Sequence, residues 1–322
     1  MSSTPHDDLS QKTLGIPEHA AGELRAVLPR KLVKRVDWST LRAEPGSFVD
    51  AGGPRRHTDL LFSATIDGRD ARLYVLFEHQ SSFDRWMPLR LLVYMSRIWV
   101  SLADERAASL PVIIPVVLYN GEGRWTASTR FSSLLDPGGP PEGARAFIPD
   151  FRFVVDDLAA VSEATLLRRP MSALARLTVW AMRSVRHDFE RALLDAWMEL
   201  LREAGDQAGV EARDQVFVYL SGVDGGDDLL QAIVARMDDE EREQVMGLRK
   251  QWEDAAREEG IEQGIERGIR RGRVESLLSQ LQLKFGDIGE ARREQIAGAS
   301  LRELERWSQR ILDATSLEDA LS

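Results

Sequence analysis

The sequence has no cysteine among its 322 residues and only five histidines. The absence of cysteine excludes a disulfide-stapled fold, a zinc site with thiolate ligands and a cysteine nucleophile. No apolar run reaches the roughly 18 residues that a membrane-spanning helix needs. The stretch from Met1 to Asp8 also lacks the apolar region of a signal peptide. We therefore expect a soluble, cytoplasmic protein without a membrane partner.

The chain also lacks an excess of positive charge, because 52 acidic residues outnumber 42 basic ones and give a net charge of −10. Taken alone, this balance argues against a nucleic-acid partner. Phosphate binding, however, requires only a local basic patch, and a bound divalent cation offsets local acidity. Hydrophobic residues make up 43% and charged residues 29%, which are values of a globular chain rather than a disordered one.

Hydrophobic patterning predicts an α/β first half and an all-helical second half. We expect strands over 59–66, 72–80, 110–119 and 151–155, and helices over 6–35 and 86–103. After about residue 160 the pattern is helical, with a helix stop at Phe285-Gly286. The predicted regions are 1–160, an α/β core, 161–245, a helical region, and 246–322, a helical tail.

The first two strands form a predicted hairpin that brings two carboxylates together. If the loop is Gly68-Arg69, Asp59 faces Glu78 directly, and if it is Asp67-Gly68, the two lie diagonally. Both registers put Asp59, Glu78 and Gln80 on one face, with directly opposed Cβ atoms about 5 Å apart. Two such carboxylates repel, and a divalent cation with a preference for oxygen, Mg²⁺ or Mn²⁺, would compensate them.

A purely structural interpretation of these two acids stays open. Asp59 and Glu78 each stand near a strand end, where carboxylates are commonly solvated. They could also pair with Arg55, Arg56 or Arg90, which lie close in the sequence. Spacing alone does not separate this interpretation from a metal site.

Asp59 followed by Glu78-His79-Gln80 resembles the signature of the PD-(D/E)XK nuclease superfamily, in a variant with Gln in place of Lys. More narrowly, the chain resembles the recombination-promoting nucleases, a family also described as transposases. The resemblance covers roughly residues 6–200. Its pieces are HDDL (6–9), LP (28–29), DW (37–38) with Thr40-Leu41, SFVD (47–50), TDLLFS (58–63), FEHQSS (77–82), MPLRLLVYM (87–95) with Ile98-Trp99, and LPVIIPVVLYNG (110–121).

The resemblance implies a PD-(D/E)XK core, a mixed sheet flanked by helices, that hydrolyses DNA with Mg²⁺ or Mn²⁺. Asp59 and Glu78 would hold the metal together with the backbone carbonyl of His79. Gln80 stands where many superfamily members have a catalytic lysine, and a neutral amide orients groups by hydrogen bonds without supplying positive charge. A further acidic ligand is expected from the first helices, Glu18 as the candidate and Glu23 as the runner-up.

The helix after the second strand supplies the predicted substrate contacts. Arg90 and Tyr94 are four residues apart and share one helix face. Arg90 would grip a phosphate, or it would pair structurally with Glu78 or Asp84. His57 precedes Asp59 by two residues and is a further candidate for phosphate contact. The large apolar residues of this helix, Trp86, Met95 and Trp99, are predicted to belong to the core.

The tail contains a four-residue repeat with Gly260, Gly264, Gly268 and Gly272. A helical glycine costs roughly 1 kcal/mol relative to alanine, so we expect close helix–helix packing, with a homo-oligomer formed through the C-terminal helices. A flexible linker helix is the alternative.

Four arginines of the tail form a basic patch that would contact DNA backbone or pair with nearby glutamates: Arg267, Arg270, Arg271 and Arg273.

These observations predict a metal-dependent DNA endonuclease that promotes recombination, with DNA as its partner. Two rival classes stay open. One is a catalytically weak nuclease-fold protein that mainly binds DNA, which the neutral Gln80 favours. The other is an oligomeric accessory factor associated with a transposon, in which the C-terminal helices carry the function.

Overall fold

The computed structural model describes residues 5–44, 60–78, 84–104, 109–135 and 141–321. The chain divides into two compact units, Met1–Arg249 and Lys250–Ser322. No helix in the described ranges is long and apolar enough to cross a membrane.

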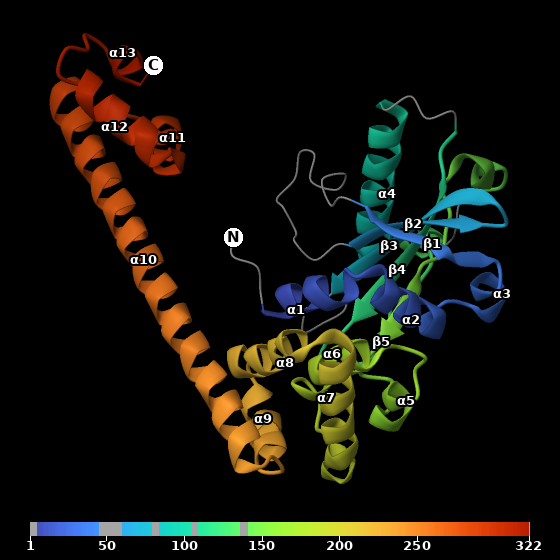
Figure 1. Ribbon diagram of the computed structural model, residues 1–322. Coiled ribbons are helices and arrows are strands. Elements are labelled where there is room, and N and C mark those ends of the chain that lie inside the picture. The colour runs from blue at the N-terminus through green and yellow to red at the C-terminus, as the bar shows by residue number, and fades with distance from the viewer. Residues whose placement is uncertain (1–4, 45–59, 79–83, 105–108, 136–140, 322) are drawn as a thin grey trace. The chain divides into compact units, whose positions relative to one another are not determined.

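The first unit is built on a mixed five-stranded sheet with the strand order β1-β2-β3-β4-β5 (Figure 1). The strands are β1 (Val36–Glu44), β2 (Leu60–Ile66), β3 (Arg69–Glu78), β4 (Val112–Tyr119) and β5 (Val154–Asp157). The first three are antiparallel, and β3, β4 and β5 are parallel. A parallel pair requires a crossover connection, and α4 (Met87–Asp104) lies in the connection between β3 and β4. The predicted mixed α/β sheet is confirmed.

The hairpin between β2 and β3 turns at Asp67 and Gly68, which have φ angles of 49° and 73°. Positive φ at both positions is the type I′ geometry that an Asp-Gly pair favours, because its twist matches that of the strands. Leu60 faces Val75 and Ile66 faces Arg69. This is the second of the two predicted registers, the one in which the loop is Asp67-Gly68.

Each face of the sheet carries its own apolar core. Phe62, Leu73 and Val116 lie in the cluster that α1 (Pro5–Leu14), α2 (Pro17–Val27) and α6 (Ala173–Ser184) share. Leu61, Tyr74 and Val117 lie in the cluster beneath α4. Leu73 and Tyr74 are both fully buried, which confirms that β3 is covered on both faces.

Further helices of the first unit extend the apolar core on the face of α1, α2 and α6. Trp180 of α6 and Trp197 of α7 have ring centroids 4.5 Å apart. The elements are α3 (Arg30–Val33), α5 (Glu163–Leu167), α7 (Leu194–Ala208), α8 (Val210–Gly222), α9 (Gly226–Val234) and short 3₁₀ turns at Phe131–Leu134, Ala144–Phe147 and Arg191–Leu193.

The second unit has its core at the C-terminal end of the long helix α10 (Asp239–Phe285), which begins in the first unit. The helices α11 (Glu290–Gly298), α12 (Leu301–Arg310) and α13 (Leu317–Ala320) pack there. Leu277, Leu281, Leu304 and Trp307 lie in this core. The predicted stop at Phe285-Gly286 is confirmed, and Gly286 has φ 84°.

Candidate active site

The hairpin that was predicted to carry the catalytic residues is described only in part. Asp59, His57, His79 and Gln80 lie outside the described residues. Glu78 is the last residue of β3, and its backbone pairs with Tyr119 of β4. Among the described residues, no group of three or more His, Asp or Glu is placed to hold a metal ion.

The backbone of Glu78 stands at the edge where three parallel strands end together. Glu78 is in register with Tyr119 of β4, and Tyr119 is in register with Asp157 of β5. In α/β sheets, the carboxyl ends of parallel strands are the usual place for a ligand site. The Asp157 carboxylate accepts hydrogen bonds from the backbone N–H groups of Trp125 (2.8 Å) and Ala159 (3.1 Å), and so holds the loops at this edge.

The first turns of α4 bring Arg90 and Tyr94 over β3. One oxygen of Asp84 accepts the backbone N–H of Trp86 at 2.8 Å, and the other lies 3.0 Å from Nη1 of Arg90. The structural partner expected for Arg90 is therefore found in Asp84, with both side chains about 80% buried (19% and 20% exposed). The ring of Tyr94 packs on that of Tyr74, with centroids 5.9 Å apart.

Trp86 corrects the prediction that all large apolar residues of this helix are core residues. Met95 is buried, and Trp99 is half-buried with its indole N–H donated to the carbonyl of Pro111 at 2.9 Å. Trp86, by contrast, is 48% exposed, although the next residue, Met87, is fully buried. Trp86 lies on the outer side of the helix with Leu89 and Val93, which follow it by three and seven residues and are 43% and 41% exposed. The Arg85 guanidinium lies 4.9 Å from the Trp86 ring centroid, a cation–π arrangement.

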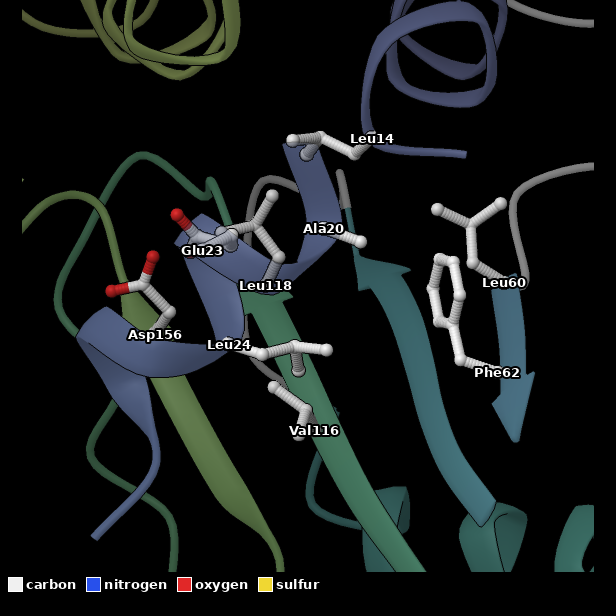
Figure 2. Close-up of a pocket in the computed structure, with 9 residues that line it drawn as sticks. All are labelled: Leu14, Ala20, Glu23, Leu24, Leu60, Phe62, Val116, Leu118 and Asp156. Atoms are coloured by element: carbon white, nitrogen blue, oxygen red, sulfur yellow. The ribbon is translucent and has the colours of Figure 1, made fainter. Parts of the chain in front are cut away.

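The opposite face of the sheet holds a buried cluster of charged side chains, Glu23 of α2, Asp156 of β5 and Arg169. Figure 2 shows the two carboxylates of this cluster, Glu23 and Asp156. The two terminal nitrogens of Arg169 each lie 2.7 Å from an oxygen of Asp156, and Nη1 lies 2.9 Å from both oxygens of Glu23. Gly22 allows α2 to lie close to the chain segment that follows Arg169, because a Cβ at Gly22 would lie only 2.9 Å from Cα of Met171. No sequence pattern marks Asp156 or Arg169 beyond their charge.

Two carboxylates compete for the one arginine in this cluster. Burial raises the pKa of Glu23 well above its ordinary value, the neighbouring Asp156 raises it further, and Arg169 opposes the shift. The cluster therefore favours a protonated Glu23 that shares its hydrogen with Asp156. Glu18, the first candidate for an additional metal ligand, is exposed in the first turn of α2.

The small cavity beside this cluster is lined mainly by apolar side chains, shown in Figure 2: Leu14, Ala20, Glu23, Leu24, Leu60, Phe62, Val116, Leu118 and Asp156. The centre of a water molecule can occupy about 10 Å³ of it, which is room for roughly one water. The cavity is therefore too small to bind a nucleotide, and its apolar side chains pack beside the charged cluster.

A larger groove of about 640 Å³ lies near the carboxyl end of β4. His6, Glu122 and Arg186 are among its lining residues, and Glu122 follows the end of β4 by three residues. Nδ1 of His6 lies 2.8 Å from the hydroxyl of Tyr219. Burial lowers the pKa of His6 to about 4, with a further contribution from Arg186, so His6 is neutral at physiological pH.

Together these features define an α/β protein with a mixed five-stranded sheet, helices on both faces and an all-helical C-terminal region. Comparison with known families is more specific. The chain belongs to the family described as "Putative transposase, YhgA-like", whose model matches residues 4–211. No solved structure gave a significant match.

Curated relatives from Escherichia coli confirm the resemblance to recombination-promoting nucleases. The recombination-promoting nuclease RpnD of strain O157:H7 is 26% identical over 76% of this chain and 92% of its own length. RpnC of strain K12 is 33% identical over 38% of this chain and 40% of its own. The inactive recombination-promoting nuclease-like protein RpnE of strain K12 is 29% identical over 55% of this chain and 58% of its own. The chain thus spans less than two thirds of RpnE and RpnC.

Proposed function

We propose that the chain is a metal-dependent DNA endonuclease that promotes recombination, built on a PD-(D/E)XK core. Its relatives include proteins named recombination-promoting nucleases. The mixed sheet flanked by helices is the architecture that this core requires. Asp59, Glu78 and Gln80 are the proposed catalytic residues, and Arg90, Tyr94 and His57 the proposed contacts to DNA.

The register of the described hairpin is the observation that supports this proposal most strongly. Leu61 and Tyr74 face each other across β2 and β3 and belong to the core beneath α4. Side chains alternate between faces with a period of two. If the same alternation continues along both strands, Asp59 and Glu78 would lie on the face of Leu61 and Tyr74, the face that α4 with Arg90 and Tyr94 covers.

The chemistry of the donor set fits Mg²⁺ or Mn²⁺. Two carboxylates and a backbone carbonyl, that of His79, are the oxygen ligands that these ions prefer. A bound Mg²⁺ would supply Lewis-acid chemistry, polarising a phosphoryl oxygen and making a water molecule more acidic. The side chains of this chain have other tasks: Gln80 would orient the phosphate by hydrogen bonds, and Arg90 would attract it by charge.

Plasmid nicking in the presence and absence of metal tests the proposed function. With Mg²⁺ or Mn²⁺ in excess over the protein, we expect supercoiled plasmid to become nicked. An excess of EDTA should remove the nicking, and added Mg²⁺ should restore it. Nicking that persists in EDTA, or that is absent with both metals, contradicts the proposal.

A specific observation also supports the catalytically weak alternative. RpnE, one of the relatives above, is named inactive, and this chain has the neutral Gln80 where many superfamily members have lysine. A protein of this kind would retard DNA in a salt-dependent manner without cutting it. An accessory factor associated with a transposon would do neither and would act through its C-terminal helices.

A further inference from the structure

The middle of α10 presents three isoleucines to solvent. Ile261, Ile265 and Ile269 are 57%, 59% and 49% exposed. A single exposed apolar residue needs no explanation. Three of them at four-residue spacing, however, form one stripe along a helix face. The apolar core of the second unit begins further along the helix, around Val274 and Leu277, and does not include the stripe.

Glycines alternate with these isoleucines along the helix. A Cβ at Gly264, Gly268 or Gly272 would meet nothing within 4 Å in the described chain. No contact among the described residues therefore requires glycine there, although each glycine costs the helix roughly 1 kcal/mol relative to alanine. Glycine on an open helix face permits the close approach of a second backbone, as small residues do at other helix–helix contacts.

Acidic residues gather at one end of the stripe and basic residues at the other. This separation of charge favours one orientation for any second copy of α10 that packs on the stripe. In the sequence, Glu258, Glu259 and Glu262 stand on the N-terminal side, and Arg267, Arg270 and Arg271 on the C-terminal side. Two parallel copies would bring like charges together. Two antiparallel copies bring the acidic side of each helix against the basic side of the other, which is favourable in a helix pair.

We propose that α10 pairs antiparallel with α10 of a second copy of this chain, with the twofold axis between positions 264 and 265. In this register Ile261 stands opposite Gly268 of the partner subunit, and Ile265 stands opposite Gly264 of the partner subunit. Ile269 then stands opposite the glycine at position 260, so every isoleucine meets a glycine. The same register places Glu258 opposite Arg271 of the partner subunit.

The charges at the two ends of this contact remain accessible for pairing. The Arg271 side chain is 83% exposed and pairs with Glu275 on the same helix, at 2.9 Å. Such an exposed pair contributes little and leaves further donors of the guanidinium for a second carboxylate. A DNA backbone would use the arginines as well, but it would leave the isoleucine stripe in water.

Single cysteines test the orientation directly, because the natural chain has none. In the antiparallel register two copies of residue 265 lie about 1.5 Å apart along the axis, two of residue 261 about 10 Å and two of residue 269 about 13 Å. A disulfide needs Cα atoms within about 7 Å. Under mild oxidation of the full-length chain, Ile265→Cys should form a disulfide-linked dimer, whereas Ile261→Cys and Ile269→Cys alone should not. Mixing Ile261→Cys with a Gly268→Cys variant should restore cross-linking.

Three different patterns would overturn this proposal. Equal cross-linking of all three isoleucine variants indicates a parallel pair. No cross-linking of any variant, together with a monomeric mass in light scattering up to about 100 μM, indicates that the stripe has no second copy. A monomer that instead binds DNA, with affinity lost in Arg271→Glu, indicates a nucleic-acid surface.

Light scattering on two matched variants measures the contribution of the stripe. Ile265→Ser should raise the dissociation constant of the dimer at least about tenfold, a change that corresponds to about 1.4 kcal/mol. Leu283→Ser, on the same helix and 86% exposed, should leave it unchanged. Glu258→Arg and Arg271→Glu should each weaken the dimer, and the double variant should restore it. Circular dichroism of each variant separates a lost dimer from a lost helix.

Discussion

Asp59→Ala and Glu78→Ala are each expected to reduce Mg²⁺-dependent plasmid nicking by about a thousandfold or more. A metal ion typically supplies several kcal/mol of transition-state stabilisation, and each 1.36 kcal/mol corresponds to about a factor of ten in rate. Either substitution removes one of two proposed carboxylate ligands, so neither variant should keep a competent site. Rates of nicking under identical metal and salt conditions give the comparison.

Asp70→Ala is the matched control for these two variants. Asp70 lies on the same hairpin, its side chain is 66% exposed, and it pairs with Arg72 at 2.9 Å. An exposed pair of this kind is worth little, so this variant should nick plasmid at the wild-type rate. Equal cleavage by all four proteins would mean that the activity comes from a contaminant or from other residues, and the assignment of Asp59 and Glu78 would be wrong.

Arg169→Ala is expected to lower the free energy of unfolding by about 3–5 kcal/mol, the usual cost of removing one partner from a buried ion pair. The side chains of Arg169, Glu23 and Asp156 are only 8%, 7% and 5% exposed. Without the guanidinium, two buried carboxyl groups face each other with no cation between them. Urea denaturation of the wild type and the variant measures the difference.

Arg130→Ala provides the control, because Arg130 forms an ion pair with Asp150 in which the two side chains are 50% and 30% exposed. Its loss should cost at most about 1 kcal/mol. If Arg169→Ala and Arg130→Ala destabilise the protein equally, the ion pairs of Arg169 with Glu23 and Asp156 do not stabilise the contact between α2 and β5.

The contribution of Glu23 to the stability of the fold is expected to decrease as the pH rises. The pKa of Glu23 is raised in the folded state, so its contribution to stability is fully present below the unfolded pKa and is lost as the pH rises through the folded pKa. Glu23→Gln should remove this loss, because the amide can donate to Asp156 at every pH. The cost of Arg169→Ala should shrink as the pH falls, since a protonated Glu23 adds no negative charge that a cation must compensate.

Local signals in the sequence predicted much of the sheet. The sequence left two loop positions open, Gly68-Arg69 and Asp67-Gly68. The type I′ geometry at Asp67-Gly68 decides between them and fixes which residues of β2 and β3 face each other. The strand β1 was missed because charged residues interrupt its apolar alternation, as in Asp37, Arg42 and Glu44. Pro115 has no backbone N–H to donate, and it lies in the part of β4 that precedes the pairing with β5.

Contacts between distant segments could not be predicted from these signals. Arg169 and Glu23 are 146 residues apart, and neither has a neighbouring motif that indicates its partner. The exposure of Trp86 was missed because large apolar residues stand on both sides of this helix, with Leu89 and Val93 also exposed, so the apolar pattern does not show which side is covered. The residues of the candidate site itself were predicted from motif and register, and Asp59, His57, His79 and Gln80 stay predictions.

Calorimetric titration with Mn²⁺ and Mg²⁺ is the most direct test of the claim that one cation is held between Asp59 and Glu78. The wild-type chain should bind about one ion per molecule at this site. Asp59→Ala and Glu78→Ala should each weaken that binding at least about tenfold, and Asp70→Ala should leave it unchanged. Unaltered metal affinity in both ligand variants, or no binding by the wild type, would contradict the account.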